Sequence, residues 1–484
     1  MGVHTVDLSG ILAYHAKIQP RRQAFVDANG GFDFEALQRR VNRLSGALLA
    51  TGIRKGDRLA LRLRNSRRHF EALFACARLG AVLVPLPTEA PSDDIDAIRR
   101  DCAPALVIES EEAYEAHLAS ASETELAPLA HSDDALLIMH TSGTTGSPKG
   151  AVLTHGNIIY TSFNQITGWR LTASDRALVV APFHHAGGLL ALGLPCLCSG
   201  GSVYVTAATP RCVLETIERE CITAVFLPPR LWSRVADDAA LSTARVQSVR
   251  LGASGGDPLP RYILERLTIS FAAEFTDAYG MTETSSCLTL QRGDKLFRRH
   301  GYAGMALPYV RLKIINTDGG EAKPNETGEI AVAGPTVMRG YWQRPEETKA
   351  AFRGGWFRTG DLGRLDDEGY LQILGRATDV IVSAGGGSIF PSEIELVLRE
   401  HPAVEEAVVI AIQRSVVADT IGAWVVLRER VDSTASELTA YCAKVLAKEK
   451  RPREIFICKT LPRNPNGKVD KAKLKEALVA GQSR

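Results

Sequence analysis

The chain has 484 residues, of which 45% are hydrophobic and 23% are charged, and its formal net charge is +2. Such a length predicts two to four units that each bury a core, and the composition excludes a disordered protein. The near balance of charge argues against a dedicated nucleic-acid binder. Neither a charged-then-apolar leader nor a membrane-length apolar run is visible, so we expect a cytoplasmic protein without a transmembrane segment.

The first third of the chain is predicted to alternate helices and strands. Asp33 is the expected cap of a helix that ends near Gly52, and RLALRL, residues 58–63, is an expected strand. A second helix runs toward Gly80, and the strand AVLVPLP follows it. This alternation is typical of an α/β protein with a parallel sheet.

The basic cluster RLRNSRRHF, residues 62–70, begins the second of these helices. A cluster of this kind can bind a polyanion or a membrane, or it can be an ordinary solvated helix start. We interpret it as a solvated helix start.

The α/β pattern continues through four apolar runs that end in small residues or proline, namely RALVVAPFHHAGG, GSVYV, ITAVFLPP and VQSVRLGASGG. Open α/β sheets bind ligands at such strand ends. From about Gly301 the sequence becomes rich in expected strands, and the last hundred or so residues form a smaller unit of mixed helices and strands. The nine cysteines show no C-x-x-C spacing, which predicts reduced and mostly buried thiols.

The segment HTSGTTGSPKGAV, from His140 to Val152, is rich in glycine and hydroxyl residues and carries one lysine. Glycines let backbone N–H groups approach an anion, and hydroxyls and an ammonium add donors, so the segment predicts a phosphate site. Its spacing differs from that of a P-loop, because Gly143 and Gly146 are too close and an expected strand, not a helix, follows Gly150. The next helix is expected only after Thr154, its predicted cap.

Four further segments carry residues that suit a nucleotide. In DAYGMTET, Tyr279 suits stacking on a base and Glu283 suits a Mg²⁺ ion that bridges phosphates. WFRTGDLG and GRATD supply Asp361 for ribose hydroxyls and Arg376 for a hydroxyl or a phosphate. LPRNPNGKVDK places Lys468 in a turn, where a carboxylate and a phosphate could share its charge.

These motifs, in this order and over nearly the whole length, make the chain similar to the adenylate-forming enzymes, which include acyl-CoA synthetases, adenylation domains and firefly luciferase. The resemblance implies an α/β fold with a large N-terminal domain of mixed and parallel sheets, residues 1–376, and a small mobile α+β domain, residues 377–484. It also implies two steps that need ATP, Mg²⁺ and CoA. A carboxylate attacks the α-phosphate of ATP to give acyl-AMP and pyrophosphate, and a thiol then takes the acyl group.

The resemblance assigns the candidate site residues. Those expected to bind the phosphates, adenine and ribose are Thr141, Ser142, Gly143, Thr144, Thr145, Gly146, Lys149, Ser254, Gly255, Gly256, Tyr279, Gly280, Asp361 and Arg376. The catalytic candidates are Thr282 at the α-phosphate, Glu283 as the Mg²⁺ ligand, Lys468 at the transferring oxygens, and His185.

Two departures from the family pattern concern the second step. Thr378 stands where relatives usually have Asp or Lys at the hinge, and SAGGGSIFP, residues 383–391, is one residue longer than the corresponding loop and lacks its Glu-Asn pair. In relatives that loop lines the thiol tunnel. Free CoA and a carrier-protein thiol therefore both stay open as acceptors. The sequence also leaves the oligomeric state open.

The acid is expected to be uncharged apart from its carboxylate. Amino-acid-activating relatives place an aspartate in the segment that corresponds to PFHHAGG, where this chain has His184 and His185. We predict a medium- or long-chain fatty acid, with an aromatic or a succinylbenzoate-type acid as the alternative. A kinase is opposed by the loop spacing, and a non-catalytic nucleotide- or acyl-binding relative by the presence of both Glu283 and Lys468.

Overall fold

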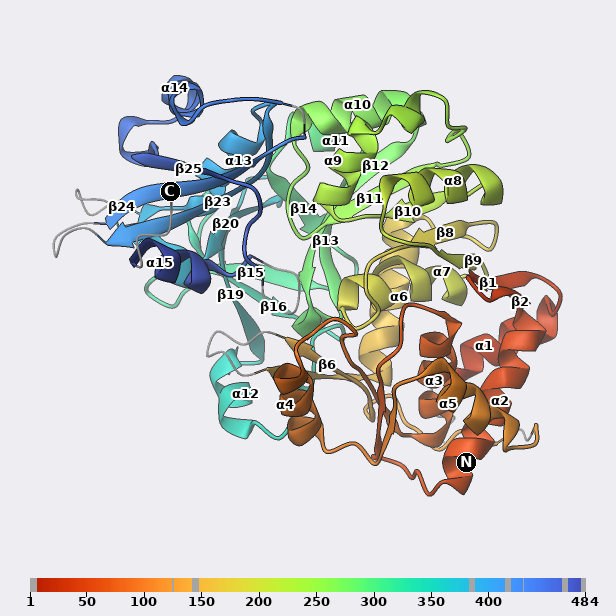
Figure 1. Cartoon of the computed structure of the whole chain (residues 1–484). Coiled ribbons are helices and arrows are strands. Elements are labelled where there is room, and N and C mark those ends of the chain that lie inside the picture. Colours follow the sequence, from red (N-terminus) through yellow and green to blue (C-terminus); the bar gives the residue numbers. More distant parts are fainter. Residues whose placement is uncertain are drawn as a thin grey trace.

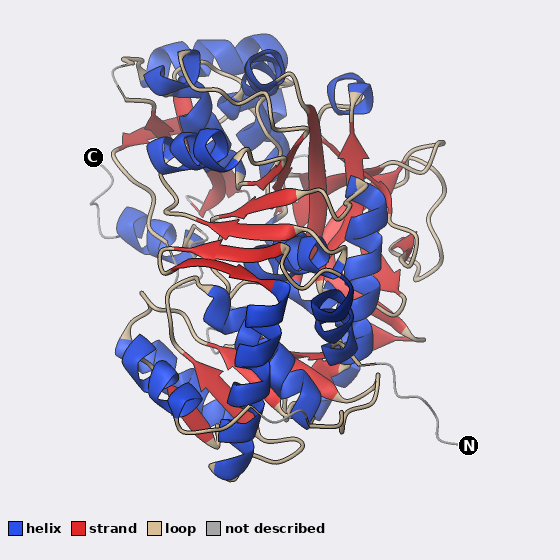
Figure 2. Ribbon diagram, turned by 90° about the vertical axis from the view of Figure 1, so that its right-hand side faces the viewer, coloured by secondary structure: helices blue, strands red, loops and turns tan. Residues whose placement is uncertain are grey.

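A computed structural model describes residues 7–123, 126–141, 148–382, 388–413, 419–429, 431–463 and 469–479 (Figure 1). Two sheets make up most of the molecule, and helices lie on both of their faces (Figure 2). A separate group of short sheets lies at the carboxyl-terminal end, in blue.

The larger sheet has fourteen strands in the order β15-β16-β19-β20-β14-β13-β12-β11-β10-β8-β9-β1-β2, with β18 paired to β19. Strands β8 to β12 are parallel to their neighbours in the series β9-β8-β10-β11-β12, as the alternating pattern predicted. The strands are β1 (Gln23–Asp27), β2 (Gly30–Asp33), β8 (Arg176–Val179), β9 (Ser202–Val205), β10 (Ala224–Phe226), β11 (Leu251–Gly255), β12 (Glu274–Met281), β13 (Ser286–Arg292), β14 (Tyr302–Ala306), β15 (Arg311–Ile315), β16 (Gly328–Ala333), β18 (Phe352–Arg353), β19 (Trp356–Leu365) and β20 (Leu371–Arg376).

The second sheet has six strands, and one of them comes from a distant part of the sequence. Its order is β17 (Gly340–Tyr341), β7 (Lys149–Thr154), β6 (Ala135–Thr141), β4 (Val82–Pro85), β3 (Arg58–Leu61) and β5 (Leu106–Ile108). The carboxyl-terminal part contains a hairpin of β21 (Ile381–Val382) and β22 (Ser388–Ile389), and a sheet of β23 (Val404–Gln413), β24 (Asp419–Leu427) and β25 (Glu454–Cys458).

Helices begin where the sequence supplies a cap. Asp33 accepts a hydrogen bond from the backbone N–H of Ala36 at 2.7 Å and so caps α2 (Phe34–Ala50), as predicted. Thr154 and Asn157 form a reciprocal capping box at the start of α6 (His155–Trp169). The other helices are α1 (Ser9–Ile18), α3 (Arg67–Leu79), α4 (Ser92–Cys102), α5 (Glu111–Ala119), α7 (Leu194–Cys198), α8 (Pro210–Glu220), α9 (Pro229–Asp237), α10 (Arg261–Phe271), α11 (Asp294–Arg298), α12 (Pro345–Ala351), α13 (Pro391–Arg399), α14 (Ala435–Val445) and α15 (Lys471–Val479).

Five short segments complete the list of helical elements. One is a π-helix, η1 (Gly187–Gly193), and the others are 3₁₀ turns, η2 (Ala239–Ser242), η3 (Thr282–Thr284), η4 (Ala377–Asp379) and η5 (Lys448–Lys450). No helix among the described residues is long and apolar enough to cross a membrane. All nine cysteines are free thiols, and five of them are buried, which agrees with the expected reduced state.

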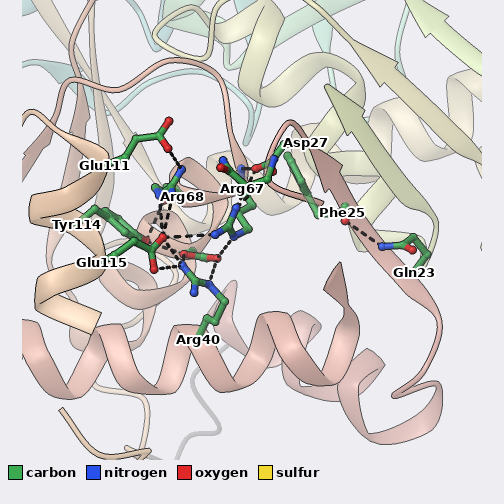
Figure 3. A network of polar contacts seen from close by, with 11 residues as sticks. Gln23, Phe25, Asp27, Arg40, Arg67, Arg68, Glu111, Tyr114 and Glu115 are labelled. Atoms are coloured by element: carbon green, nitrogen blue, oxygen red, sulfur yellow. Dashed lines mark hydrogen bonds and ion pairs between the residues drawn. The ribbon is translucent and has the colours of Figure 1, made fainter. Parts of the chain in front are cut away.

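Arg67 and Arg68, at the start of α3, are buried, so the prediction of a solvated helix start is wrong there, although Arg64 of the same cluster is exposed (Figure 3). The guanidinium group of Arg67 pairs with Asp27 at 3.3 Å, and that of Arg68 pairs with Glu115 at 2.9 Å. Arg40, from α2, binds Glu71 and Glu115 in the same network. The carboxylates that neutralise these arginines come from β1, α3 and α5, and the local sequence pattern could not reveal them.

Apolar residues form separate cores on the two sides of the hinge region. The buried residues of three clusters all lie at or before Leu371. Those of two further clusters all lie at or after Ile381. The carboxyl-terminal sheet packs its own helices α13 and α14. The division at residues 376 and 377 stays a prediction.

Candidate active site

The predicted phosphate segment connects two antiparallel strands. Thr141, at the end of β6, is the register partner of Lys149, at the start of β7. An extended strand therefore follows the segment, as its sequence predicted, and the difference from a P-loop is confirmed. Ser142, Gly143, Thr144, Thr145 and Gly146 lie outside the described residues.

Tyr341 joins this region to the predicted Mg²⁺ ligand. Strand β17 pairs with the outer edge of β7, so Tyr341 faces Ala151. The Lys149 ammonium lies 5.6 Å from the centre of the Tyr341 ring, and the Tyr341 hydroxyl donates a hydrogen bond to Glu283 Oε1 at 3.1 Å. Burial and the nearby Glu283 carboxylate raise the pKa of Tyr341, which keeps the phenol protonated and able to donate. Sequence reasoning missed Tyr341, because a tyrosine after a glycine carries no distinctive signal.

Thr282 and Glu283 form the turn η3 directly after β12. The backbone carbonyl of Glu283 accepts a hydrogen bond from the N–H of Met338 at 2.8 Å, and both Thr282 and Glu283 are partly exposed. The turn is therefore fixed by the segment that leads into β17. One carboxylate oxygen of Glu283 is oriented by Tyr341, and the role of this carboxylate as a Mg²⁺ ligand stays a prediction.

Three residues from three predicted motifs meet at Asp361. Asp361 and Arg376 face each other in the pairing of β19 with β20, and Arg376 Nε lies 3.0 Å from Asp361 Oδ1. The Tyr279 hydroxyl donates to Asp361 Oδ2 at 2.6 Å. Burial, and then the charge of Asp361, raises the pKa of Tyr279 well above its ordinary value, so this phenol also stays protonated. The buried Asp361 is thus held between a phenol and a half-exposed guanidinium group.

The small residues at the end of β11 lie beside β12, the strand that carries Tyr279. In the parallel pairing of β11 with β12, Ser254 faces Asp277 and Gly255 faces Ala278. Ser254 is fully buried, and its hydroxyl makes no hydrogen bond to any described residue. Gly256 has a φ of +98° and open space at its missing side chain, which suits close approach of a ligand.

Gly280 is required by the fold of its own strand. A Cβ atom on Gly280 would lie 1.7 Å from the carbonyl oxygen of Ser286 on β13. This contact fixes the bend between β12 and η3 at the point where Thr282 and Glu283 follow. Gly280 therefore shapes the site, while its contact with a nucleotide stays a prediction.

The predicted acid segment meets the nucleotide region at Phe226, the last residue of β10. A Cβ atom on Gly255 would lie 3.6 Å from the Phe226 ring, and one on Gly187 would lie 3.9 Å from the same ring. The Trp169 ring lies behind it, with the ring centres 6.1 Å apart. Phe226 therefore lies between Gly187 and Gly255, which belong to separate segments of the sequence.

The histidines of this segment pack against each other. The rings of His184 and His185 are 4.2 Å apart, and His69 contacts the neighbouring Phe183. Burial lowers the pKa of His184 to about 3 and that of His69 to about 4. Both imidazoles are therefore neutral at physiological pH.

Two models of known protein families match this chain. The family model of AMP-binding enzymes matches residues 12–342, and that of the AMP-binding enzyme C-terminal domain matches residues 393–468. The chain belongs to the AMP-binding enzyme family.

Relatives of known activity match this chain over nearly its whole length. A feruloyl-CoA synthase of an Amycolatopsis species is 33% identical, over 95% of this chain and 96% of that protein. A long-chain-fatty-acid–CoA ligase of Mycobacterium tuberculosis is 30% identical, over 98% of this chain and 99% of that protein. The solved structure of o-succinylbenzoate CoA synthetase from Bacillus subtilis, in complex with the acyl-adenylate intermediate, has a TM-score of 0.87 and 32% identity and covers 97% of this chain and 98% of that chain.

The expected adenylate-forming fold is confirmed by this structural likeness. The expected reaction class is confirmed as well, namely an AMP-forming acid–CoA ligase that uses ATP, Mg²⁺ and CoA. The roles of the individual site residues stay predictions, and Lys468 lies outside the described residues.

Proposed function

We propose that this ligase activates an aromatic or aryl-substituted monocarboxylic acid and transfers it to CoA. The observation that carries the proposal is the position of Phe226. Its ring is 8% exposed and lies beside Gly187 and Gly255, with Trp169 behind it. The missing side chain of Gly187 leaves space beside this buried aromatic ring, which suits a planar ring better than a flexible chain.

The histidines in and beside the predicted acid segment favour an acid with one carboxylate only. The neutral imidazoles of His69 and His184 offer no fixed positive charge that could pair with a second carboxylate. This argues for an acid of the feruloyl type over a dicarboxylic one such as succinylbenzoate. A protonated amino group would also find no acidic partner in the segment from Pro182 to Gly188.

In this proposal Lys149 and the segment that it ends would bind the β- and γ-phosphates, and Asp361 with Arg376 would bind the ribose. Glu283 would hold Mg²⁺, which supplies positive charge to the phosphate oxygens. Tyr341 would keep the carboxylate of Glu283 turned toward that ion. Lys468 would add its charge where the acid attacks the α-phosphate, and this role rests on the sequence motif alone.

The fatty-acid prediction stays a rival. It is supported by the long-chain relative and would require that the acid pass beyond the Phe226 ring. Transfer to a carrier-protein thiol also stays a rival for the second step, because residues 383–387 of the loop that would distinguish it lie outside the described part.

A panel of acids tests the proposal. Cinnamic, benzoic, decanoic and hexadecanoic acids would each be assayed for pyrophosphate and AMP release, with and without CoA. We expect kcat/KM for the best aromatic acid to exceed that for either fatty acid by about tenfold or more, since a misfit of one or two methylene groups costs about 1–3 kcal/mol. A preference for hexadecanoic acid would restore the fatty-acid prediction.

A further inference from the structure

A carboxylate outside the predicted motifs connects strand β6 with the segment between β17 and α12. Asp101, in the last turn of α4, binds His140 Nε2 through Oδ2 and Arg344 Nη2 through Oδ1, both at 3.0 Å. Figure 1 shows α4 beside α12, although about 240 residues separate Asp101 from Arg344. The side chain of Asp101 is only 13% exposed and that of His140 only 5% exposed.

Each partner of Asp101 lies next to a residue of the candidate site. His140 immediately precedes Thr141, the register partner of Lys149. Arg344 follows Tyr341 by three residues, and Tyr341 binds Glu283. The carboxylate therefore connects the strand that leads into the phosphate segment with the segment that orients the predicted Mg²⁺ ligand.

The absence of a side chain at Gly150 leaves room for the His140 imidazole. A Cβ atom on Gly150 would lie 3.1 Å from His140 Nε2, so the imidazole occupies space that a side chain on β7 would take. The carbonyl of Gly150 accepts a hydrogen bond from the N–H of Trp342 at 2.7 Å, which extends the pairing of β17 with β7. Burial opposes ionisation of Asp101, but the bonds from His140 and Arg344 outweigh it and lower the pKa of this carboxyl.

We propose that Asp101 is a positioning residue for the adenylation step, which holds Lys149 and the Glu283–Tyr341 pair at the spacing that the phosphates of ATP need. The proposal rests on the proposed phosphate role of the segment from Thr141 to Lys149. Pyrophosphate is present only in the first step of the reaction. Loss of the connection should therefore impair adenylation and leave the transfer of a preformed acyl-adenylate to CoA intact.

Asp101→Ala tests this connection in the full-length enzyme. Binding of MgATP would be measured by calorimetry, adenylation by ATP–pyrophosphate exchange with the acid that the parent enzyme uses best, and transfer by thioester formation from supplied acyl-adenylate and CoA. We expect the Kd and the KM for ATP to rise about tenfold and transfer to stay within twofold of the parent. Asp96→Ala is the matched control, because Asp96 lies on the same helix but is exposed and faces Arg99.

Two substitutions of His140 separate the hydrogen bond from the packing of the ring. His140→Gln keeps a donor for Asp101 and should stay near the parent, whereas His140→Leu removes it and should resemble Asp101→Ala. Unchanged ATP binding in Asp101→Ala would overturn the proposal. Equal loss of adenylation and transfer would also overturn it, because Asp101 would then support the fold as a whole.

Lys149→Met distinguishes failure of this proposal from failure of the proposed phosphate site. If Lys149→Met weakens ATP binding and Asp101→Ala does not, only the positioning role is wrong. If Lys149→Met leaves ATP binding unchanged, the phosphate site is wrong, and the role of Asp101 fails with it.

Discussion

The contribution of the Tyr341 hydroxyl group, which donates a hydrogen bond to Glu283, to the adenylation rate can be measured. Tyr341→Phe keeps the ring beside Lys149 but removes the donor to the carboxylate. A hydrogen bond to a charged group contributes about 1.5–3 kcal/mol, so we expect adenylation to slow by about tenfold to a hundredfold. The Mg²⁺ concentration for half-maximal pyrophosphate release should rise at the same time. An unchanged Mg²⁺ dependence would show that Tyr341 does not orient the metal ligand.

The buried carboxyl of Asp277 leads us to predict that the stability of the folded chain depends on pH. Burial, and to a lesser extent Asp257, raises its pKa from 3.8 to about 7. Between these two values the unfolded chain has lost the proton that the folded chain keeps, so the folded state loses stability as the pH rises. Asp277→Asn retains an acceptor for the N–H of Ala278 and carries no charge. At pH 8 its free energy of unfolding should exceed that of the parent by up to about 4 kcal/mol, and its melting temperature should be higher. Both differences should be smaller at pH 5.

Unfolding scans of both proteins at pH 5, 6.5 and 8 would check this expectation. A difference between the two proteins that does not change with pH would mean that the Asp277 carboxyl ionises normally in the folded chain.

At the scale of elements, the π-helix η1 sets the size of the proposed acid site. A Cβ atom on Gly187 would meet only the Phe226 ring, at 3.9 Å, so Gly187→Val is expected to narrow the space without moving the backbone. The kcat/KM for the best aromatic acid should fall about tenfold or more, while the KM for ATP stays nearly constant. Gly187→Ala serves as the conservative control. A rise in the KM for ATP would place Gly187 at the nucleotide instead.

Gly255 is a poorer position for this test, although its sequence context suggests it equally. A Cβ atom there would lie 2.7 Å from the carbonyl oxygen of Ala278, so a larger side chain would disturb the pairing of β11 with β12. A loss of ATP binding in a Gly255 variant would therefore not distinguish the two ligands.

Structural elements that depend on neighbouring residues could be predicted from the sequence, whereas contacts between distant segments could not. The cap of α2 at Asp33 and the capping box at Thr154 depend on residues three positions apart, and the sequence reveals both. The resemblance implied that Asp361 and Arg376 both bind the ribose, and the pairing of β19 with β20 places them side by side. The roles of Tyr341 and Asp101 depend on the pairing of β17 with β7 and on the packing of α4, and no local pattern encodes either.

At the scale of the whole molecule, ion pairs join the carboxyl-terminal part to α9 and α10. The Arg428 guanidinium, only 9% exposed, binds Asp237 and the hydroxyl of Tyr262. Glu400 accepts a hydrogen bond from the backbone N–H of Arg261 at 2.8 Å. These contacts hold the two parts in one arrangement, while the connecting turn η4 stays largely exposed.

Arg428→Ala should loosen this arrangement and expose the chain near Arg376 to protease. If about 1.4 kcal/mol of docking energy is lost, trypsin should cleave after Arg376 about tenfold faster. Mass spectrometry of the fragments would identify the site. Arg219→Ala, which removes an exposed arginine paired with Glu220 on α8, is the matched control. Equal cleavage rates in both variants would mean that Arg428 does not govern access to this segment.

The addition of β17 to the edge of β7 also has a consequence for biosynthesis. Val152 cannot form its strand pairing until Gly340 has been synthesised. At roughly 5–20 residues per second, the ribosome needs on the order of 10–40 s to make the intervening chain. Throughout that interval the apolar strand β7 presents unpaired N–H and C=O groups to its surroundings. A nascent chain shorter than about 340 residues is therefore exposed to aggregation at the strand that follows the predicted phosphate segment, and chaperone binding during translation would protect it there.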